Sequence, residues 1–324
     1  MSEPLLILIP IFNEWDLLAE LLARIEAALA PAGLSADVVL LDDGSTTEHE
    51  GRIQLPEFDA IDSVEILRLA RNLGHQRAIS IGLAWASENR PGRTVVIMDG
   101  DGEDNPADIL KLLARYEAER GRKIVFAART RRMERWQFQL CYRIYQLVHL
   151  LLTGHRVRVG NFSIVPPAAV QQLAVISETW NHYAAAVFNS RIPYDMVPTP
   201  RDRRLGGRSR MNFTALVVHG LSALSVFSHI IGVRLLIASA ILMLAALAGL
   251  ILGSFAGGSD PSLAATASWL SAISAWLLAT LFQAVILGVA FVLLVLSSRQ
   301  GTTFLPKRDY RYFVASLTPL TPRS

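Results

Sequence analysis

The chain has 324 residues, of which 52% are hydrophobic and 18% charged, and its formal net charge is +3. Intrinsic disorder is excluded, because disordered chains combine low hydrophobicity with high net charge. The mean hydropathy of +0.34 is higher than soluble domains usually reach, so we expect part of the chain to lie in lipid. The single cysteine, Cys141, excludes an internal disulfide framework and any zinc or iron–sulfur site built from several cysteines, and it suits a reducing compartment.

The first residues, MSEPLLILIP, do not resemble a secretory signal, because they lack a basic start and a proline closes the short apolar run. We therefore expect everything before the first membrane helix to stay in the cytoplasm. Short runs rich in Val, Ile and Leu then predict buried strands at Leu5–Ile9, Val38–Leu41, Val64–Leu69, Thr94–Met98 and Ile124–Ala127. Amphipathic stretches between them predict helices at Glu14–Leu29, Gln76–Ala86 and Ala107–Ala118. This alternation predicts an α/β fold with a mostly parallel sheet flanked by helices, in one domain of residues 1–210.

Polar clusters follow three of these strands. They are Pro10 to Glu14, Asp42 to Ser45, and Asp99 to Asp104. Each cluster taken alone is compatible with an ordinary turn, where Asp, Asn and Gly are favoured. Carboxylates gathered at one sheet edge repel each other, however, and are usually tolerated where a cation or hydrogen-bond donors neutralise them. Ligands in such folds also bind at the carboxyl ends of the strands, so we expect the functional site there.

The segment from Asp99 to Asp104 predicts a cation site. Two carboxylates separated by one residue, on a glycine-containing turn after a buried strand, suit a hard divalent cation such as Mg²⁺ or Mn²⁺ and leave positions for phosphate oxygens and water. A calcium-binding EF-hand is the competing interpretation. It is rejected because the loop follows a strand, its sixth position is Asp104 rather than Gly, and its twelfth is Leu110 rather than Glu.

Two further segments are candidates for contact with a membrane surface. Residues 136–153 predict an amphipathic helix whose aromatic side chains favour the lipid interface, although packing on the sheet explains the same apolar stripe. Residues 213–229, within a juxtamembrane segment 211–234, are equally compatible with core packing and with lipid contact. The arginines between positions 201 and 210 have few interleaved aromatic residues and precede a membrane span, so we expect lipid head groups and donor phosphates as their partners and no nucleic acid.

Two apolar runs, Leu235–Leu252 and Trp269–Leu296, are each long enough to cross about 30 Å of hydrocarbon. They predict a two-helix transmembrane domain over residues 235–296. The connection at 253–268 contains no Lys or Arg, whereas arginines precede the first run and a basic tail at 297–324 follows the second. The positive-inside rule therefore predicts an integral protein of the cell (inner) membrane with its catalytic domain and both termini in the cytoplasm. A pair of buried core helices is the alternative, which the run lengths and the one-sided charge disfavour.

Six motifs in order carry a resemblance to a known family. They are IPIFNE (Ile9 to Glu14), DDGS (Asp42 to Ser45), RNLGHQRAISIGL (Arg71 to Leu83), DGDGEDNP (Asp99 to Pro106), AAR (Ala127 to Arg129) and RLGGRSR (Arg204 to Arg210). Together with the two apolar runs, they resemble the inverting family 2 glycosyltransferases of GT-A fold. Among these the chain looks most like the polyprenyl-phosphate group, the dolichol-phosphate mannose synthase type with two C-terminal membrane helices.

The resemblance implies a role for each matching position. Donor binding is implied for Pro10, Phe12, Glu14, Asp43, Asp99, Gly100, Asp101, Arg129, Arg204 and Arg210. Binding of Mg²⁺ or Mn²⁺ is implied for Asp99, Asp101 and Glu103, and acceptor binding for Arg143, Asn161 and Ser209. Catalytic roles are implied for Arg129 and Arg143, and Asp101 and Asp104 are candidate bases.

The sequence departs from the family pattern at three of these positions. Glu103 stands where the family usually has Gln, which adds a negative charge to the cation site, and Arg210 replaces the closing Lys of its segment. Asn161 stands where bacterial relatives have an Asp that has been proposed as the base, and an amide takes up no proton near neutral pH. A phosphate acceptor tolerates that loss, because its second pKa is about 6 and it is largely ionised at pH 7.

The resemblance thus predicts a membrane-anchored, metal-dependent inverting transferase that moves one sugar from a UDP- or GDP-sugar to polyprenyl phosphate. Two alternatives stay open. One is transfer to a hydroxyl-bearing lipid or glycan, for which Asp101 or Asp104 would act as the base. The other is a non-catalytic membrane partner that binds nucleotide and helps to present a lipid-linked sugar. The sugar, the choice between UDP and GDP, and homo-oligomerisation are left open by the sequence.

Overall fold

The computed structural model describes residues 4–47, 55–129, 146–155, 159–200, 202, 204–206, 213–256, 261–298 and 304–320. It divides into two compact units. The first, here called the sheet unit, comprises Met1–Arg143, Arg156–Val226 and Phe304–Ser324, and the second, the helix-pair unit, comprises Ile144–His155 and Phe227–Thr303. Each unit is described by itself.

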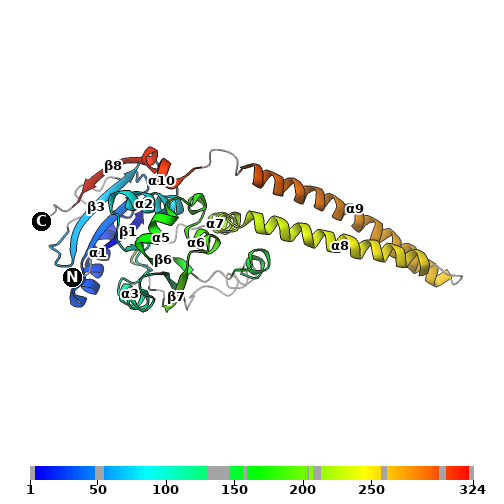
Figure 1. Cartoon of the computed structure of the whole chain (residues 1–324), viewed down its shortest axis with the longest axis horizontal. Coiled ribbons are helices and arrows are strands. Elements are labelled where there is room, and N and C mark those ends of the chain that lie inside the picture. The colour runs from blue at the N-terminus through cyan, green and yellow to red at the C-terminus, as the bar shows by residue number, and fades with distance from the viewer. Residues whose placement is uncertain are drawn as a thin grey trace. The chain divides into compact units, whose positions relative to one another are not determined.

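An eight-stranded mixed sheet forms the centre of the sheet unit, in the order β7-β5-β6-β4-β1-β2-β3-β8 (Figure 1). The strands are β1 Leu5–Ile11, β2 Ala36–Asp42, β3 Ile61–Leu69, β4 Val95–Ile97, β5 Ile124–Arg129, β6 Val159–Val165, β7 Tyr194–Thr199 and β8 Val314–Pro319. The run from β4 through β1 and β2 to β3 is parallel, and β5 is parallel to β7. Only β6 and β8 run against their neighbours within the described part of the chain. The predicted mostly parallel sheet is confirmed.

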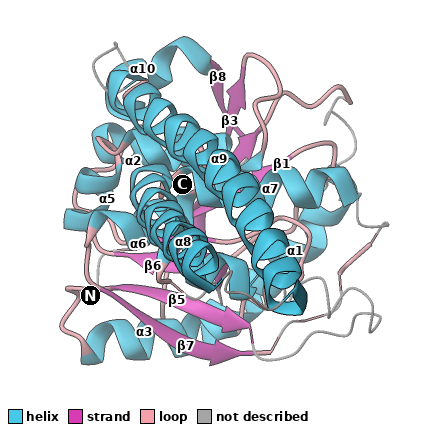
Figure 2. Ribbon diagram, turned by 90° about the vertical axis from the view of Figure 1, so that its right-hand side faces the viewer, coloured by secondary structure: helices cyan, strands magenta, loops and turns pink. Residues whose placement is uncertain are grey.

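Helices cover both faces of this sheet (Figure 2). They are α1 Trp15–Leu29, α2 His75–Asn89, α3 Asp108–Ala118, α5 Pro167–Leu173 and α6 Tyr183–Ser190, and the sheet unit also contains α7 Phe213–Ser225. Every residue of β1 is buried, as a central strand between two helical layers requires. Side chains alternate between the faces of a strand, so Ile7 and Ile9 join the core formed with α1 and α3, whereas Leu6 and Leu8 face the opposite layer. α2 packs on β1 and β2 in that layer.

The five predicted strands and three predicted helices are all present, with ends within a few residues of those expected. The sequence analysis missed the last three strands. The fold differs most from the prediction at the C-terminus. Residues 297–324 were expected to form a basic tail. Instead, β8 pairs antiparallel with β3, placing Leu317 opposite Leu67 and extending the sheet.

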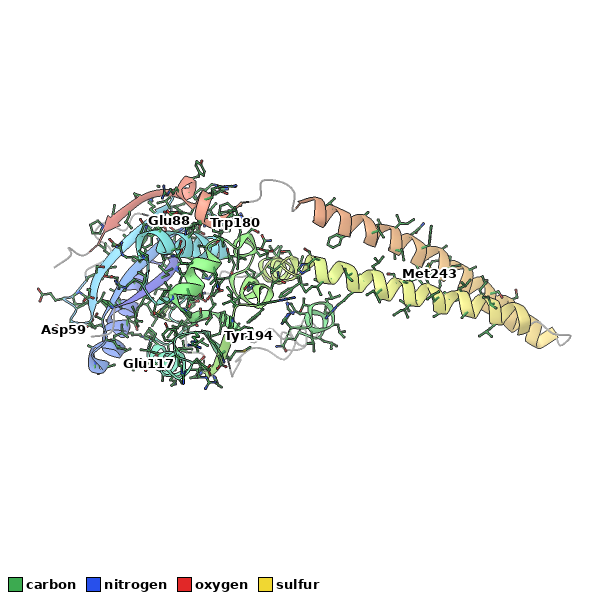
Figure 3. All side chains as sticks on the ribbon, in the orientation of Figure 1. Asp59, Glu88, Glu117, Trp180, Tyr194 and Met243 are labelled. Atoms are coloured by element: carbon green, nitrogen blue, oxygen red, sulfur yellow. The ribbon has the colours of Figure 1, made fainter. Side chains whose placement is uncertain are left out.

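Side-chain contacts hold this returning segment on the sheet unit. The hydroxyl of Tyr310 donates to Oε2 of Glu88 over 2.8 Å, and Arg311 forms an ion pair with the same carboxylate over 2.6 Å. The ring of Trp180 lies 3.8 Å from that of Phe304, centroid to centroid. Glu88 and Trp180 mark this region in Figure 3. The segment is thus part of the folded sheet unit.

The helix-pair unit consists mainly of two long apolar helices, α8 Ser228–Ala256 and α9 Pro261–Ser298, which pack along each other. By length and composition each could cross a membrane: the candidate spans Ser228–Leu252 and Ser271–Phe291 have mean hydropathies of 2.8 and 2.0. Hardly any residue in these spans is buried, unlike the core helices of a soluble protein. Both helices begin earlier than predicted. Met243 marks α8 in Figure 3.

Residues 146–153 are also helical and belong to the helix-pair unit. They form the second part of the predicted amphipathic helix 136–153, whose first part lies outside the described residues. Leu147 and Leu151 are exposed. Nη1 of Arg234, on α8, donates to the carbonyl oxygen of Leu151 over 2.8 Å and so caps the end of this helix.

We predict that Tyr310→Ala lowers the free energy of unfolding by about 3 kcal/mol, because the buried ring leaves a cavity and Glu88 loses a hydrogen bond. Tyr312→Ala is the matched control, since the Tyr312 side chain is 82% exposed. Thermal unfolding of the detergent-solubilised protein measures both. Equal midpoints for the two variants would show that the C-terminal segment does not contribute to the fold.

Candidate active site

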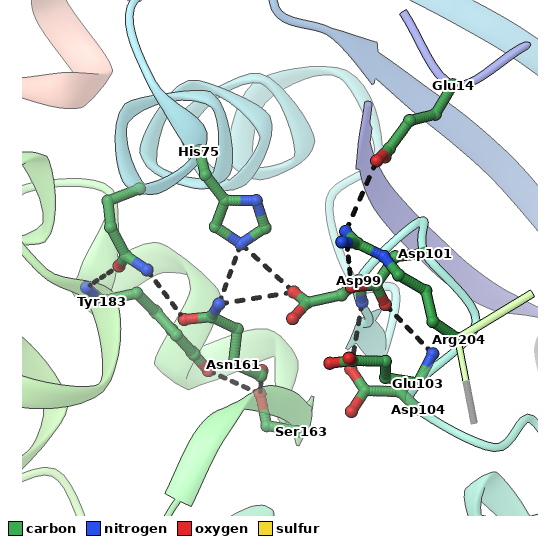
Figure 4. A network of polar contacts seen from close by, with 11 residues as sticks. Glu14, His75, Asp99, Asp101, Glu103, Asp104, Asn161, Ser163, Tyr183 and Arg204 are labelled. Atoms are coloured by element: carbon green, nitrogen blue, oxygen red, sulfur yellow. Dashed lines mark hydrogen bonds and ion pairs between the residues drawn. The ribbon is translucent and has the colours of Figure 1, made fainter. Parts of the chain in front are cut away.

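The candidate site lies at the edge of the sheet where β1, β2 and β4 end. β6 runs antiparallel to β4, with Ser163 opposite Ile97, so the same register continued past β4 places Asn161 opposite Asp99. The start of β6 therefore meets the ends of the parallel strands. This arrangement brings together residues that are far apart in the sequence, as Figure 4 shows.

The acidic loop after β4 packs tightly against its neighbours. A side chain at Gly100 would lie 3.0 Å from Ile11 and 3.1 Å from the carbonyl oxygen of Pro10, so glycine allows the loop to approach the end of β1. Gly102 has a φ of +76°, a conformation that glycine adopts readily, and a side chain there would collide with Leu205. The loop is thus enclosed by β1 on one side and, on another, by Asp202 and residues 204–206, here called the 202–206 segment for its described residues.

Asp99 is the centre of a polar network. Its Oδ1 lies 3.1 Å from Nε2 of His75 and accepts a hydrogen bond from Nδ2 of Asn161 over 3.3 Å. Its backbone N–H donates to Oδ2 of the buried Asp104 over 3.1 Å, so Asp104 shapes the loop. Desolvation opposes a charge on the His75 ring, but the carboxylates of Asp99, Asp101 and Asp104 outweigh it and raise the pKa of His75 above its usual value.

Asp101 faces a different partner. Its Oδ2 pairs with Nη2 of Arg204 over 3.0 Å, and the same guanidinium nitrogen lies 3.6 Å from Oε1 of Glu14 (Figure 4). Two backbone hydrogen bonds tie the 202–206 segment to the loop: the N–H of Leu205 donates to the carbonyl of Asp101, and that of Asp202 donates to the carbonyl of Glu103. Glu14, Asp101 and Arg204, for which the resemblance implies donor binding, thus lie around one point, and their role in binding stays a prediction.

Asp43 supports the site from the end of β2. Its two carboxylate oxygens accept the backbone N–H groups of Leu73 and Gly74 over 2.7 and 2.8 Å, which fixes the turn that leads into α2 and thereby His75. Burial of this carboxylate raises its pKa, although the two N–H donors and His75 act in the opposite direction. Asp43 thus positions the start of α2, and its implied role in donor binding stays a prediction.

The sequence analysis gave no role to Asn13, which lies within the first motif. Asn13 has a φ of +55°, and its Oδ1 accepts the backbone N–H groups of Thr46 and Thr47 over 2.9 and 3.0 Å. It therefore joins the ends of β1 and β2. The signal was present in the sequence, because Asn tolerates the left-handed conformation and bonds nearby backbone.

Several predicted residues are not placed by the structure. Arg143, Ser209 and Arg210 lie outside the described residues, and the side chain of Arg129, the last residue of β5, lies outside them as well. Pro10 is buried at the end of β1, and Phe12 follows it in the loop that leads to α1. The roles assigned to these residues remain predictions.

The acidic loop offers oxygen ligands for a divalent cation. Among the described residues, no three His, Cys, Asp or Glu side chains gather in a way that could hold a metal ion, and the assignment of Asp99, Asp101 and Glu103 as ligands stays a prediction. Asp99 and Asp101 still offer hard oxygen ligands two residues apart, and the pairing of Asp101 with a guanidinium shows that this carboxylate accepts a positive charge. Two carboxylates fit Mg²⁺ or Mn²⁺ when a diphosphate and water complete the shell.

Comparison with known proteins identifies the family. The family described as "Glycosyl transferase family 2" matches residues 6–182, more than half of the chain. The chain belongs to glycosyltransferase family 2. The sheet and flanking helices of this glycosyltransferase agree with the GT-A fold expected from the sequence.

Three individual relatives share between 14% and 34% of their residues with this chain over the aligned parts. An uncharacterized glycosyltransferase of Synechocystis sp. is 25% identical over 70% of this chain and 70% of its own length. The undecaprenyl-phosphate 4-deoxy-4-formamido-L-arabinose transferase of Pseudomonas fluorescens strain Pf-5 is 34% identical, over 41% of this chain and 39% of its own. Mannosyl-3-phosphoglycerate synthase from Rubrobacter xylanophilus superposes with a TM-score of 0.48 and 14% identity, over 69% of this chain and 72% of its own.

We predict that Gly102→Ala loosens the 202–206 segment of the glycosyltransferase, because the new methyl group displaces Leu205 and with it Arg204. Gly33→Ala is the matched control: Gly33 also has a positive φ, but a side chain there would meet nothing within 4 Å. Both substitutions cost about 1 kcal/mol through backbone strain. Hydrogen exchange at residue 205 should accelerate only in Gly102→Ala, and equal rates in the two variants would contradict the docking of this segment on the acidic loop.

Proposed function

We propose that this family 2 glycosyltransferase transfers one sugar from a nucleotide-sugar, a UDP- or GDP-sugar, to polyprenyl phosphate with inversion at the anomeric carbon. The observation that carries the proposal is the grouping of Asp99 and Asp101 with Arg204 at the sheet edge, since carboxylates and a guanidinium together suit a metal-bound diphosphate. The similarity to an undecaprenyl-phosphate sugar transferase supports this class of acceptor.

In the proposed reaction an oxygen of the acceptor phosphate forms a bond to the anomeric carbon. The bond from that carbon to the donor phosphate oxygen breaks, and its electron pair leaves with the nucleoside diphosphate. A single displacement converts an α-linked donor into a β-linked product. No proton has to be removed, because a phosphate monoester is already largely ionised near pH 7. The absence of a carboxylate at Asn161 is therefore compatible with a phosphate acceptor.

The described residues divide this work. Asp99 and Asp101 would hold Mg²⁺ or Mn²⁺, which supplies positive charge to the leaving diphosphate. Arg204, which pairs with Asp101 over 3.0 Å, would bind a donor phosphate in place of that carboxylate. The paired oxygens of a phosphate match the forked guanidinium. Arg129 and Arg143 are the remaining proposed phosphate ligands. Arg210 is proposed to bind the donor and Ser209 the acceptor.

The helix-pair unit supports a membrane-anchored version of this reaction. α8 and α9 have the length and composition of membrane spans, and polyprenyl phosphate is itself a membrane lipid. Orientation with the sheet unit on the cytoplasmic side follows from the arginines that flank the apolar runs. The proposed acceptor would then be reached at the cytoplasmic leaflet.

We predict that purified protein with Mn²⁺ transfers label from a UDP- or GDP-sugar into lipid extracts when polyprenyl phosphate is supplied. Asp101→Asn should reduce transfer about 10²- to 10³-fold, because it removes charge that holds the leaving diphosphate. Asp16→Asn, at an exposed position of α1, is the control and should transfer normally.

Replacing polyprenyl phosphate with the corresponding polyprenol separates the alternatives. Equal transfer to both would favour the hydroxyl acceptor, which also predicts a pH–rate profile set by a carboxylate. Nucleotide binding without turnover of any common donor would favour the non-catalytic partner. Full activity of Asp101→Asn would contradict the role given to this residue.

We predict opposite sides of the membrane for the 257–260 connection and the C-terminus. In a Cys141→Ser background, Ser259→Cys should react with a membrane-impermeant maleimide in intact cells, whereas Ser324→Cys should react only after lysis. Labelling of Ser324→Cys in intact cells would reverse the proposed orientation.

A further inference from the structure

A chain of hydrogen bonds runs from the start of α6 to Asp99. The backbone N–H of Tyr183 donates to Oε1 of Gln76 over 2.7 Å, and Nε2 of Gln76 donates to Oδ1 of Asn161 over 3.0 Å. Nδ2 of Asn161 then lies 3.3 Å from Oδ1 of Asp99 and 2.8 Å from Nε2 of His75. Figure 4 marks the contacts of Asn161 with Asp99 and His75 by dashed lines. Three separate elements, α6, α2 and β6, thus contribute to one chain.

The backbone N–H of Tyr183, at one end of this series of hydrogen bonds, determines which group donates in each bond. A backbone N–H can only donate, so the oxygen of the Gln76 amide must face Tyr183 and its nitrogen must face Asn161. Asn161 consequently accepts with Oδ1 and presents its NH₂ group to the site. Reversing either amide would set two donors or two acceptors against each other.

Because the two amides are buried, they are held in this orientation. Gln76 is 9% exposed, Asn161 is 8% exposed and Tyr183 is fully buried, so water has little access to replace a lost partner. An unsatisfied polar group in such surroundings is costly, and the sequence therefore commits both amides to one orientation. Gln76, in the first turn of α2, thus controls which atoms of Asn161 meet the acidic loop.

We propose that Gln76 is a positioning residue for the nucleotide-sugar donor: it keeps Asn161 oriented as a hydrogen-bond donor to Asp99. The hydrogen bond fixes Oδ1 of Asp99, and with it the plane of the carboxylate that is to face the donor diphosphate and its cation. Asn161, expected from the sequence to contact the acceptor, acts instead on the donor side. The inference rests on the proposed role of Asp99 in donor binding and does not depend on which acceptor is used.

Binding of UDP and of GDP, each with Mn²⁺, to the full-length protein tests the inference by calorimetry. Gln76→Met keeps the size of the side chain but removes both hydrogen bonds, and we expect it to weaken nucleotide binding roughly tenfold. Ser80→Ala is the matched control on the same helix: the buried Ser80 bonds Thr179 over 2.8 Å, outside the chain to Asp99. It should lower the unfolding midpoint and leave nucleotide affinity unchanged.

A double-mutant cycle distinguishes positioning from loss of packing. Asn161→Ala should also weaken binding roughly tenfold, while it leaves the bond between Tyr183 and Gln76 in place, and it serves as the test if Gln76→Met fails to fold. Gln76→Met in the Asn161→Ala background should then have no further effect, because Gln76 acts only through Asn161.

The inference would be overturned if the losses of nucleotide affinity in Gln76→Met and Asn161→Ala multiplied in the double variant. It would also be overturned if Gln76→Met and Ser80→Ala bound nucleotide equally well. Failure of the wild-type protein to bind either nucleotide would also overturn it, since no donor would then exist for Asp99 to meet. Nucleotide binding with the expected pattern but without sugar transfer would contradict the proposed reaction and leave the role of Gln76 standing.

Discussion

The antiparallel pairing of β6 with β4 is the constraint on which the site depends. In a wholly parallel sheet the carboxyl ends of the strands would meet at one edge, and the start of a neighbouring strand would lie at the other. Because β6 runs in reverse, its first residues come to the edge where β4 ends, and the register sets Asn161 opposite Asp99. An amide donor is thereby added to an edge otherwise supplied with carboxylates.

Charge balance explains much of the remaining architecture. Asp99, Asp101 and Asp104 lie within six residues of one another, and such a group is costly without donors or cations around it. The structure meets this cost with backbone N–H groups of the loop itself and with Arg204, which pairs with Asp101. Arg204 lies far from the loop in the sequence, so the acidic loop also organises a distant segment of the chain.

The sequence predicted the elements whose signal is local. β1, β2, β4 and β5 contain uninterrupted apolar runs, β3 is rich in Val, Ile and Leu, and α1 shows the helical spacing of Leu18, Leu22 and Ile25. β6, β7 and β8 were not predicted, because their place in the sheet is set by pairing with distant strands. The role of Gln76 was also invisible, since a glutamine at the start of a helix ordinarily faces water, and only the tertiary fold brings Tyr183 and Asn161 to it.

The ion pair of Asp101 and Arg204 suits the proposed binding of a metal-bound diphosphate. The guanidinium neutralises Asp101, and the backbone hydrogen bonds of Asp202 and Leu205 hold this segment beside the acidic loop. A nucleotide-sugar bound with a divalent cation would bring both a stronger positive charge for Asp101 and a diphosphate for Arg204. The cation would replace Arg204 as the positive partner of Asp101, and the diphosphate would replace Asp101 as the negative partner of Arg204. Neither charge would then be left uncompensated. A neutral side chain at position 204 would lose both halves of this exchange, which is a physical reason for an arginine at this position.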